Sequence, residues 1–340
     1  MAYTDIDDPS AYFQTKTYSG TGSTTSITND GNSDLQPDWI WIKKRNAVAS
    51  HMLGDSTRGT TKYLSSDLGD AESTATNRVT AFNSDGFSLG NAGSVNNGSH
   101  TYVAWQWKAN GGTTSSNTDG YLTSTVQANT TAGFSIVTFT TDGSTRTVGH
   151  GLGVKPDVIL IASRNVAGGF LFITDVIDGS MDYGVLRSSN AFASIGYNAP
   201  TSTVFEYNDN NTNTQVAYCF AEKQGYSKFG KYTGNGNANG TFVYTGFKPA
   251  FVMWKQTNSA RNWPIMDSTR DPFNEVDQMV WADLTNAEST VTTDDVDFLS
   301  NGFKMRGAGA TTNESGGTYI YMAFAENPFV TSTGIPTTAR

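Results

Sequence analysis

The sequence predicts an all-β protein made of three tandem, diverged β-sandwich modules of jelly-roll-like type. The first observation is composition: 340 residues contain 35 Gly, 19 Phe, 15 Tyr and 7 Trp, with a hydrophobic content of only 37%. Short strands joined by tight turns have this composition, whereas helices need more Ala, Leu, Glu and Lys. A disordered chain would lack the aromatic residues. The second observation is a set of short apolar runs, and the third is their recurrence in a fixed order.

One such run closes each of three blocks of the chain. Its clearest copy spans residues 317–326, and looser copies span residues 102–107 and 217–222. Aromatic, β-branched and small residues dominate all three, which predicts strands with little access to water. Because the small and aromatic positions recur while the polar ones change, we interpret the run as a core strand and not as a binding site.

The first and third blocks share further segments in the same order. Residues 55–58 and 267–270 both read Asp-Ser-Thr-Arg, and residues 71–74 and 287–290 both read Ala-Glu-Ser-Thr. Identical segments in the same order, with small insertions between them, indicate homologous repeats whose loops have drifted.

The middle block is the most diverged. Pro156 precedes an apolar run as Pro37 and Pro249 do, and a proline can open a strand without interrupting its ladder. Of the Asp-Ser-Thr-Arg segment, the block keeps only Asp175. The resulting division is a first sandwich with an N-terminal arm (1–108), a Gly/Ser/Thr/Asn-rich linker (109–132), a second sandwich (133–224), a third sandwich (225–330) and a C-terminal tail (331–340).

Charge and cysteine content exclude several classes of protein. The net charge is -9 and no block of Lys or Arg stands out, so we expect no nucleic-acid partner. Cys219 is the only cysteine and lies in a core-strand run, so we interpret it as a small buried residue. No apolar run approaches the roughly 18 residues that span a bilayer, and the acidic start is no signal peptide. We expect no membrane insertion and synthesis in a cytoplasm.

The histidines predict neither a metal nor a cofactor. His51, His100 and His150 lack partners at metal-ligand spacing. The glycine-rich residues 149–153 lead toward another strand and not into a helix, so they predict a turn and not a phosphate loop.

The recurring aspartates are the natural candidates for glycoside hydrolysis. That reaction needs two carboxyl groups roughly 5–10 Å apart across one cleft, whereas Asp55, Asp175 and Asp267 lie at equivalent positions of separate modules. In Asp-Ser-Thr-Arg the aspartate can accept backbone N–H groups two or three residues on and pair with the arginine. We interpret the segment as turn-stabilising and predict no catalytic residue; contact with a divalent ion or a sugar stays open.

Four residues are candidates for surface contacts. Trp263 and Trp281 lie in polar, loop-like surroundings, and Asn211 and Asn235 lie in Asn-rich loops. Exposed aromatic and Asn side chains are the groups with which sugar-binding loops stack on and hydrogen-bond to glycans.

Three motifs and the tail resemble a family of bacteriophage virion proteins common in marine phages and built from one repeated β-rich module. They are Gly-Phe-Ser-Ile-Val at 133–137, Val-Gly-His-Gly-Leu-Gly at 148–153, Tyr-Ile-Tyr-Met-Ala-Phe-Ala-Glu-Asn-Pro-Phe at 319–329 and the tail 334–340. The resemblance covers essentially the whole chain. It implies a structural or host-contacting, tail-fibre-like component and brings no catalytic residues.

We therefore expect a non-enzymatic protein on the surface of a virion, assembled in the host cytoplasm. It would adsorb to host-surface glycan, contact other virion proteins and form a homo-oligomer, with a trimer as one possibility. Three alternatives stay open: a capsid decoration or head-fibre protein, a polysaccharide depolymerase, and a free lectin.

Overall fold

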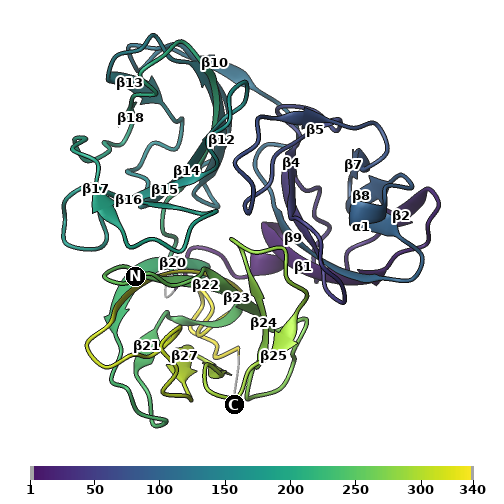
Figure 1. The fold of residues 1–340 in the computed structure, drawn as a ribbon, viewed down its shortest axis with the longest axis vertical. Coiled ribbons are helices and arrows are strands. Elements are labelled where there is room, and N and C mark those ends of the chain that lie inside the picture. The colour runs from purple at the N-terminus through teal and green to yellow at the C-terminus, as the bar shows by residue number, and fades with distance from the viewer. Residues whose placement is uncertain (1–3, 338–340) are drawn as a thin grey trace.

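A computed structural model describes residues 4–337; residues 1–3 of the expected arm and 338–340 of the expected tail lie outside the described residues. Nearly all regular structure is β, as predicted. Three lobes surround a common centre (Figure 1); we call them lobe 1 (residues 13–107), lobe 2 (115–220) and lobe 3 (227–328). Within residues 4–337, no helix has the length and apolar character needed to cross a membrane.

Lobe 1 contains a four-stranded sheet, β1-β9-β3-β4, a three-stranded sheet, β2-β8-β7, and the pair β5-β6. Its elements, with the short 3-10 turn before them, are η1 (Pro9–Ala11), β1 (Phe13–Ser19), β2 (Thr25–Ile27), β3 (Trp39–Lys44), β4 (Met52–Asp55), β5 (Lys62–Tyr63), β6 (Ser73–Thr74), β7 (Val79–Asn83), β8 (Gly86–Leu89), α1 (Gly93–Asn96) and β9 (Thr101–Trp107).

Lobe 2 contains an eight-stranded sheet, β10-β11-β12-β19-β14-β15-β16-β17, and the pair β13-β18. Its strands are β10 (Ser115–Asn117), β11 (Ser124–Asn129), β12 (Phe134–Thr140), β13 (Arg146–Gly149), β14 (Val158–Ser163), β15 (Leu171–Thr174), β16 (Asp182–Val185), β17 (Ala193–Ser194), β18 (Val204–Tyr207) and β19 (Thr214–Phe220).

Lobe 3 contains a six-stranded sheet, β20-β28-β22-β23-β24-β25, and a three-stranded sheet, β21-β27-β26. Its strands are β20 (Ser227–Thr233), β21 (Phe242–Tyr244), β22 (Phe247–Gln256), β23 (Pro264–Asp267), β24 (Gln278–Trp281), β25 (Ser289–Thr290), β26 (Val296–Leu299), β27 (Gly302–Met305) and β28 (Thr318–Pro328).

The large sheet has the same central order in every lobe. The closing strand (β9, β19 or β28) lies between the lobe's first long strand (β1, β12 or β20) and the strand near the proline (β3, β14 or β22). Pro37 and Pro156 precede their strands, while Pro249 lies inside β22 where the pairing shifts register. A register shift is one of the few places at which a strand tolerates proline.

The large sheets are covered on both faces because side chains alternate along each strand. On β3, Ile40 and Ile42 point into a core between the two sheets of lobe 1. Trp39 and Trp41 point the other way, into a larger core to which all three lobes contribute. Lobes 2 and 3 each have a core of their own in the same way. This two-sided burial explains why the proline-led strands read as continuous apolar runs.

Three aromatic residues at one register position meet where the lobes converge. Trp107, Phe220 and Phe324 occupy the same position on the three closing strands. Their ring centroids lie 5.5 Å (Trp107–Phe324), 5.9 Å (Phe220–Phe324) and 6.4 Å (Trp107–Phe220) apart. Separations of 4.5–7 Å are favourable for aromatic pairs, so this cluster joins the lobes at the centre.

The segment expected as a linker takes part in a sheet. Residues 115–117 and 124–129 form β10 and β11, and β11 pairs along the edge of β12. By pairing with β12, β11 satisfies the N–H and C=O groups that β12 would otherwise leave unpaired at the edge of the sheet. Of the other residues between 109 and 132, residues 109–114 connect lobe 1 to lobe 2, and the rest connect β10, β11 and β12 within lobe 2.

Candidate functional site

Asp55 lies at the end of β4 and is fully buried. One carboxylate oxygen accepts the Arg58 N–H at 2.8 Å. The other accepts the Arg58 guanidinium and, from lobe 2, the Tyr218 hydroxyl at 2.7 Å. The predicted bonds within Asp-Ser-Thr-Arg are therefore confirmed. The bond from Tyr218 across the lobe boundary could not be predicted from local spacing.

Glu72 extends this network to a second arginine. It accepts Arg58 at 2.9 Å, and it binds Arg164 of lobe 2 with both oxygens, at 2.9 and 3.0 Å. Burial alone would raise the pKa of Glu72, but the hydrogen bonds from Arg164 and Arg58 outweigh burial and hold the pKa below its ordinary value. The carboxylate is thus kept charged between two lobes.

The same arrangement recurs between lobes 3 and 1. Asp267 binds the backbone N–H of Arg270 at 2.8 Å and the Arg270 guanidinium, and it accepts the Trp105 indole N–H of lobe 1 at 3.0 Å. Glu288 accepts Arg270 at 2.8 Å and Arg45 of lobe 1 at 2.7 Å. Trp105 and Tyr218 lie at the same position of their closing strands. The two contacts between lobes are therefore formed by residues at equivalent positions.

In the third contact, between lobes 2 and 3, uncharged residues replace the buried aspartate and its arginine. The register places Thr174, and not Asp175, where Asp55 and Asp267 lie. Ile177 follows three residues later at the place of the arginine, and Met322 of β28 stands where Trp105 and Tyr218 stand. Ile177 packs against the central core with Met322. The expectation that Asp175 is an equivalent aspartate is wrong, because the register puts Thr174 at that position and the Asp175 carboxylate pairs with Lys155 instead.

The aspartate and the arginine of such a buried pair have to be replaced together, because replacing only one of them is costly. A buried ion pair that loses one partner leaves an uncompensated charge, which costs about 3–5 kcal/mol, whereas replacing the whole set by apolar residues is often neutral. Asp55 and Asp267 have no exposure, and both oxygens of each accept hydrogen bonds. These two carboxylates hold lobes together and offer no free group for hydrolysis.

His51 is also part of a contact between lobes. The Trp41 indole, which can only donate, bonds to His51 Nδ1 at 2.7 Å, so Nε2 carries the proton and donates to the Trp281 carbonyl at 2.9 Å. Burial, with the nearby charge of Lys43, lowers the pKa of His51 to about 3. His51 is therefore a neutral structural residue.

His150 and Cys219 are also buried residues with structural roles. His150 lies in the turn between β13 and β14, accepts Leu152 N–H at 3.2 Å and has its pKa lowered by burial. Cys219 is fully buried, as predicted, and burial raises the pKa of its thiol. Among residues 4–337, no three His, Cys, Asp or Glu side chains are placed to hold a metal ion.

The four predicted contact residues do not come together. Trp263 is only 1% exposed and donates its indole N–H to the Val185 and Ser188 carbonyls of lobe 2, so the prediction that it is exposed is wrong. Trp281 is half-buried. Asn211 and Asn235 are exposed, but they lie on separate lobes, and Asn235 bonds within its own turn. Trp263 lies in a polar stretch of the sequence, and that stretch itself contacts lobe 2: the Arg261 N–H donates to the Ser189 carbonyl at 2.8 Å.

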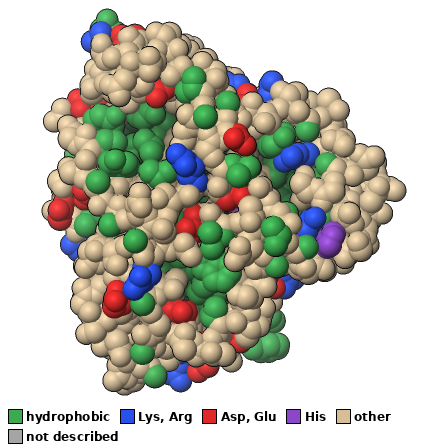
Figure 2. Space-filling view, in the orientation of Figure 1, with side chains coloured by type: hydrophobic (Ala, Val, Ile, Leu, Met, Phe, Trp, Pro, Cys, Tyr) green, Lys and Arg blue, Asp and Glu red, His purple; other side chains and the backbone are tan. Residues whose placement is uncertain are grey.

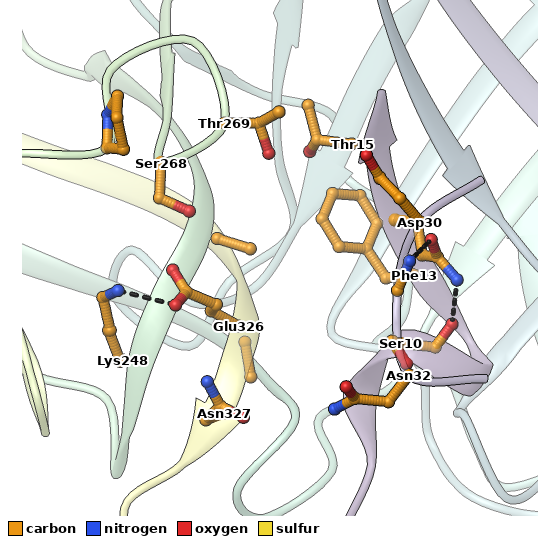
Figure 3. A pocket seen from close by; sticks show the side chains of 15 residues that line it. Ser10, Phe13, Thr15, Asp30, Asn32, Lys248, Ser268, Thr269, Glu326 and Asn327 are labelled. Carbon is orange, nitrogen blue, oxygen red and sulfur yellow. Dashed lines mark hydrogen bonds and ion pairs between the residues drawn. The ribbon is translucent and has the colours of Figure 1, made fainter. Parts of the chain in front are cut away.

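A cleft of about 400 Å³ lies between lobes 1 and 3. Figure 3 shows its two walls: one is formed by β1 and the loop at Asp30 and Asn32, and the other by β22, β28 and the turn at Ser268 and Thr269. Lys248 and Glu326 form a 2.6 Å ion pair on the lobe 3 wall. The sequence did not single out this cleft, because its walls come from opposite ends of the chain.

Thr15 stands out on the lobe 1 wall. Its side chain is 8% exposed, and its buried hydroxyl finds no hydrogen-bonding partner within residues 4–337. Native proteins rarely bury a polar atom without a partner. Ser268 and Thr269 place two further hydroxyls on the opposite wall. The cleft therefore offers unused donors and acceptors.

The visible surface shows no concentration of one charge. Lys and Arg side chains are scattered singly over the face in Figure 2, with Asp and Glu between them. In comparisons with known proteins, a family model described as a domain of unknown function (DUF7483) matches residues 8–328. No curated protein and no solved structure matches the chain.

Proposed function

The chain belongs to the DUF7483 family, and from its structure we propose that it is a non-enzymatic structural protein of a virion surface, tail-fibre-like, that adsorbs to host glycan. One observation carries the proposal: the buried charged residues that recur in the chain form contacts between lobes. Asp55 and Asp267 each bind an arginine of their own lobe and an aromatic donor of the next. Such a body is a rigid support for surface loops, which is the requirement of an adhesion protein.

The three lobes, in this proposal, are diverged copies of one sandwich module. Their large sheets share the order of their central strands, and Trp107, Phe220 and Phe324 meet from the same register position. Asn96 and Asn313 bond a glycine-rich turn in the same way in lobes 1 and 3: each accepts one backbone N–H, of Thr21 or Asn235. Repetition at this level of detail supports common descent of the lobes.

Glycan contact, in this proposal, involves the exposed loops. Asn211 and Asn235 supply amides that hydrogen-bond to sugar hydroxyls, and Phe273 and Tyr244 are 71% and 59% exposed aromatic residues on which a sugar ring can stack. The sequence resemblance to marine phage virion proteins supports the same placement. Partners then include other virion proteins, and the fused three-lobed body takes the place that a trimer of separate chains has in other adhesins.

A capsid decoration protein is the second candidate. The near-threefold arrangement of the lobes (Figure 1) favours it, because a body with three similar lobes suits a position of threefold symmetry on a particle. Such a protein would dock through a broad face and would need no glycan.

Labelling intact phage particles with an antibody against this chain tests the proposal. Signal at the tail tip supports the adhesin, signal spread over the head supports the decoration protein, and particles without signal contradict both. A glycan array supplies the second measurement: the adhesin binds at least one host-type glycan, and an Asn211→Ala/Asn235→Ala variant binds it less. Shortening of a host polysaccharide by the pure protein would instead show a depolymerase.

A further inference from the structure

The cleft between lobes 1 and 3 has the open edge of a sheet as one wall. β1 is the outermost strand of its sheet. The Tyr12 carbonyl accepts Lys108 N–H, and Gly20 N–H donates to the His100 carbonyl, both at 2.9 Å. Backbone groups alternate in direction along an antiparallel pair. The N–H and C=O groups of Phe13 and Thr15 therefore point away from β9 and toward the cleft.

Lobe 2 shows what such an edge accepts. Its strand β12 corresponds to β1, with Phe134 at the position of Phe13 and Ile136 at the position of Thr15. The edge of β12 is covered by β11, which runs antiparallel and places Gln127 opposite Ile136. In this lobe the chain itself supplies the additional strand.

The side chain of Gln127 closes the contact with lobe 1. It is fully buried, and its amide donates to Ser56 Oγ at 2.9 Å and to Thr57 Oγ1 at 2.7 Å. Ser56 and Thr57 belong to the Asp-Ser-Thr-Arg turn, and the same turn in lobe 3 supplies Ser268 and Thr269. Those two hydroxyls line the cleft opposite Thr15 (Figure 3).

We propose that this cleft is an acceptor for one extended segment of a partner protein, which adds as a strand to the edge of β1. The segment runs antiparallel to β1 and resembles residues 124–129 in chemistry: small or β-branched residues with an amide side chain opposite Thr15. The amide bonds Ser268 and Thr269, and its neighbours give the Thr15 hydroxyl the partner that it lacks. Main-chain bonds supply affinity and the amide pocket supplies selectivity.

The other edge strand of this kind does not offer the same site. In lobe 3 the corresponding strand is β20, and Lys231 on it donates to the Ile177 carbonyl of lobe 2 at 2.6 Å. Ile177 and Phe192 also pack against the core at this boundary. At the three contacts, the edge of β12 is therefore paired with β11, the edge of β20 is bridged to lobe 2 by Lys231, and the edge of β1 is open. The inference does not depend on the virion assignment, because it rests on the cleft alone.

A synthetic peptide tests the proposal with the full-length chain. The probe is a fluorescein-labelled peptide of residues 122–131, and a second peptide carries the substitution Gln127→Leu. Fluorescence anisotropy is expected to show saturable binding of the first peptide below about 1 mM, and binding of the second weakened about tenfold, the loss for one to two hydrogen bonds.

Protein variants locate the binding. Thr15→Pro removes an N–H that points to the cleft and not to β9, and Ser268→Ala/Thr269→Ala removes the two hydroxyls; each is expected to weaken binding about tenfold or more. Thr233→Pro is the matched control, because it places a proline on the edge strand β20 outside the cleft. If Thr15→Pro fails to fold, the alanine pair decides.

Three results would overturn the proposal. They are no saturable binding up to about 1 mM, equal binding of the two peptides, or undiminished binding by Ser268→Ala/Thr269→Ala. Binding by Thr233→Pro at the wild-type level completes the support.

Discussion

Tyr218 of lobe 2 donates its hydroxyl to Asp55 of lobe 1 at 2.7 Å, although 163 residues separate them. Both side chains are fully buried, and Arg58 contacts both, donating to the Tyr218 oxygen at 2.9 Å. Burial raises the pKa of Tyr218 far above the ordinary tyrosine value. The hydroxyl thus remains protonated, and a donor, at neutral pH.

Removing this hydroxyl is expected to weaken the boundary between lobes 1 and 2. Tyr218→Phe should lower the free energy of unfolding by about 2 kcal/mol, the usual contribution of a hydrogen bond to a charged group. Urea denaturation measures it. Tyr244→Phe is the control, because Tyr244 is 59% exposed and should change stability by less than about 0.5 kcal/mol. Equal stability of the two variants would contradict the assigned bond.

Asp267→Ala is expected to cost about 3–5 kcal/mol, because it leaves the buried Arg270 guanidinium without its main partner. Loss of a turn hydrogen bond alone would cost only roughly 1 kcal/mol. Asp175→Ala provides the comparison: its partner Lys155 is 42% exposed, so the loss should stay within about 1 kcal/mol. Thermal or urea unfolding that gives similar losses for both would refute the distinction between the buried ion pair of Asp267 and the partly exposed ion pair of Asp175.

A carboxylate introduced at the apolar contact between lobes 2 and 3 should supply the aspartate of the Asp–Arg pair without its arginine. Thr174→Asp is expected to destabilise by about 3 kcal/mol, because the new charge is buried without an arginine. Adding Ile177→Arg should recover at least about 1 kcal/mol, measured as the interaction energy of a double-mutant cycle. Purely additive losses would show that position 177 is not equivalent to Arg58.

His51 makes stability depend on pH in one direction. Its pKa falls from 6.5 to about 3 on folding, so between these values the unfolded chain binds a proton that the folded chain does not. Its contribution is fully present above pH 6.5 and is lost as the pH falls toward 3. The slope is about 1.4 kcal/mol per pH unit.

The test compares unfolding free energies of the wild type and His51→Gln from pH 7 to pH 4. The comparison is needed because burial raises the pKa of Asp283 to about 6, which acts with the opposite sign in both proteins. The wild type should lose stability faster on acidification. Parallel profiles would exclude a buried neutral His51.

The sequence predicted the all-β class and the turn bonds of the Asp-Ser-Thr-Arg segment, because both depend on local composition and spacing. It does not show the register of the closing strands, since Tyr102 lies in register with Tyr319 and not with Tyr321. The two tyrosines have the same role: each hydroxyl bonds a backbone carbonyl nine residues before it, of Gly93 or Ala310. A pattern of Tyr and small residues is too short to distinguish registers two apart.

The contacts between lobes were beyond the reach of sequence reasoning. Arg164 and Glu72, or Arg45 and Glu288, are far apart in the chain and neither spacing nor period relates them. Trp263 was predicted exposed for the same reason, since the lobe that covers it is distant in sequence. The recurrence of Glu at residues 72 and 288 was the one available signal that these positions matter.

The unequal edges of the three lobes determine how many partners one molecule can hold. Three identical chains in a ring would repeat every edge, so that each ring would carry either three open edges or none. Joining the lobes in one chain lets β11 cover the edge of β12 while β1 stays open. The molecule is thereby monovalent, and assemblies that contain it should show one partner segment for each three-lobed body.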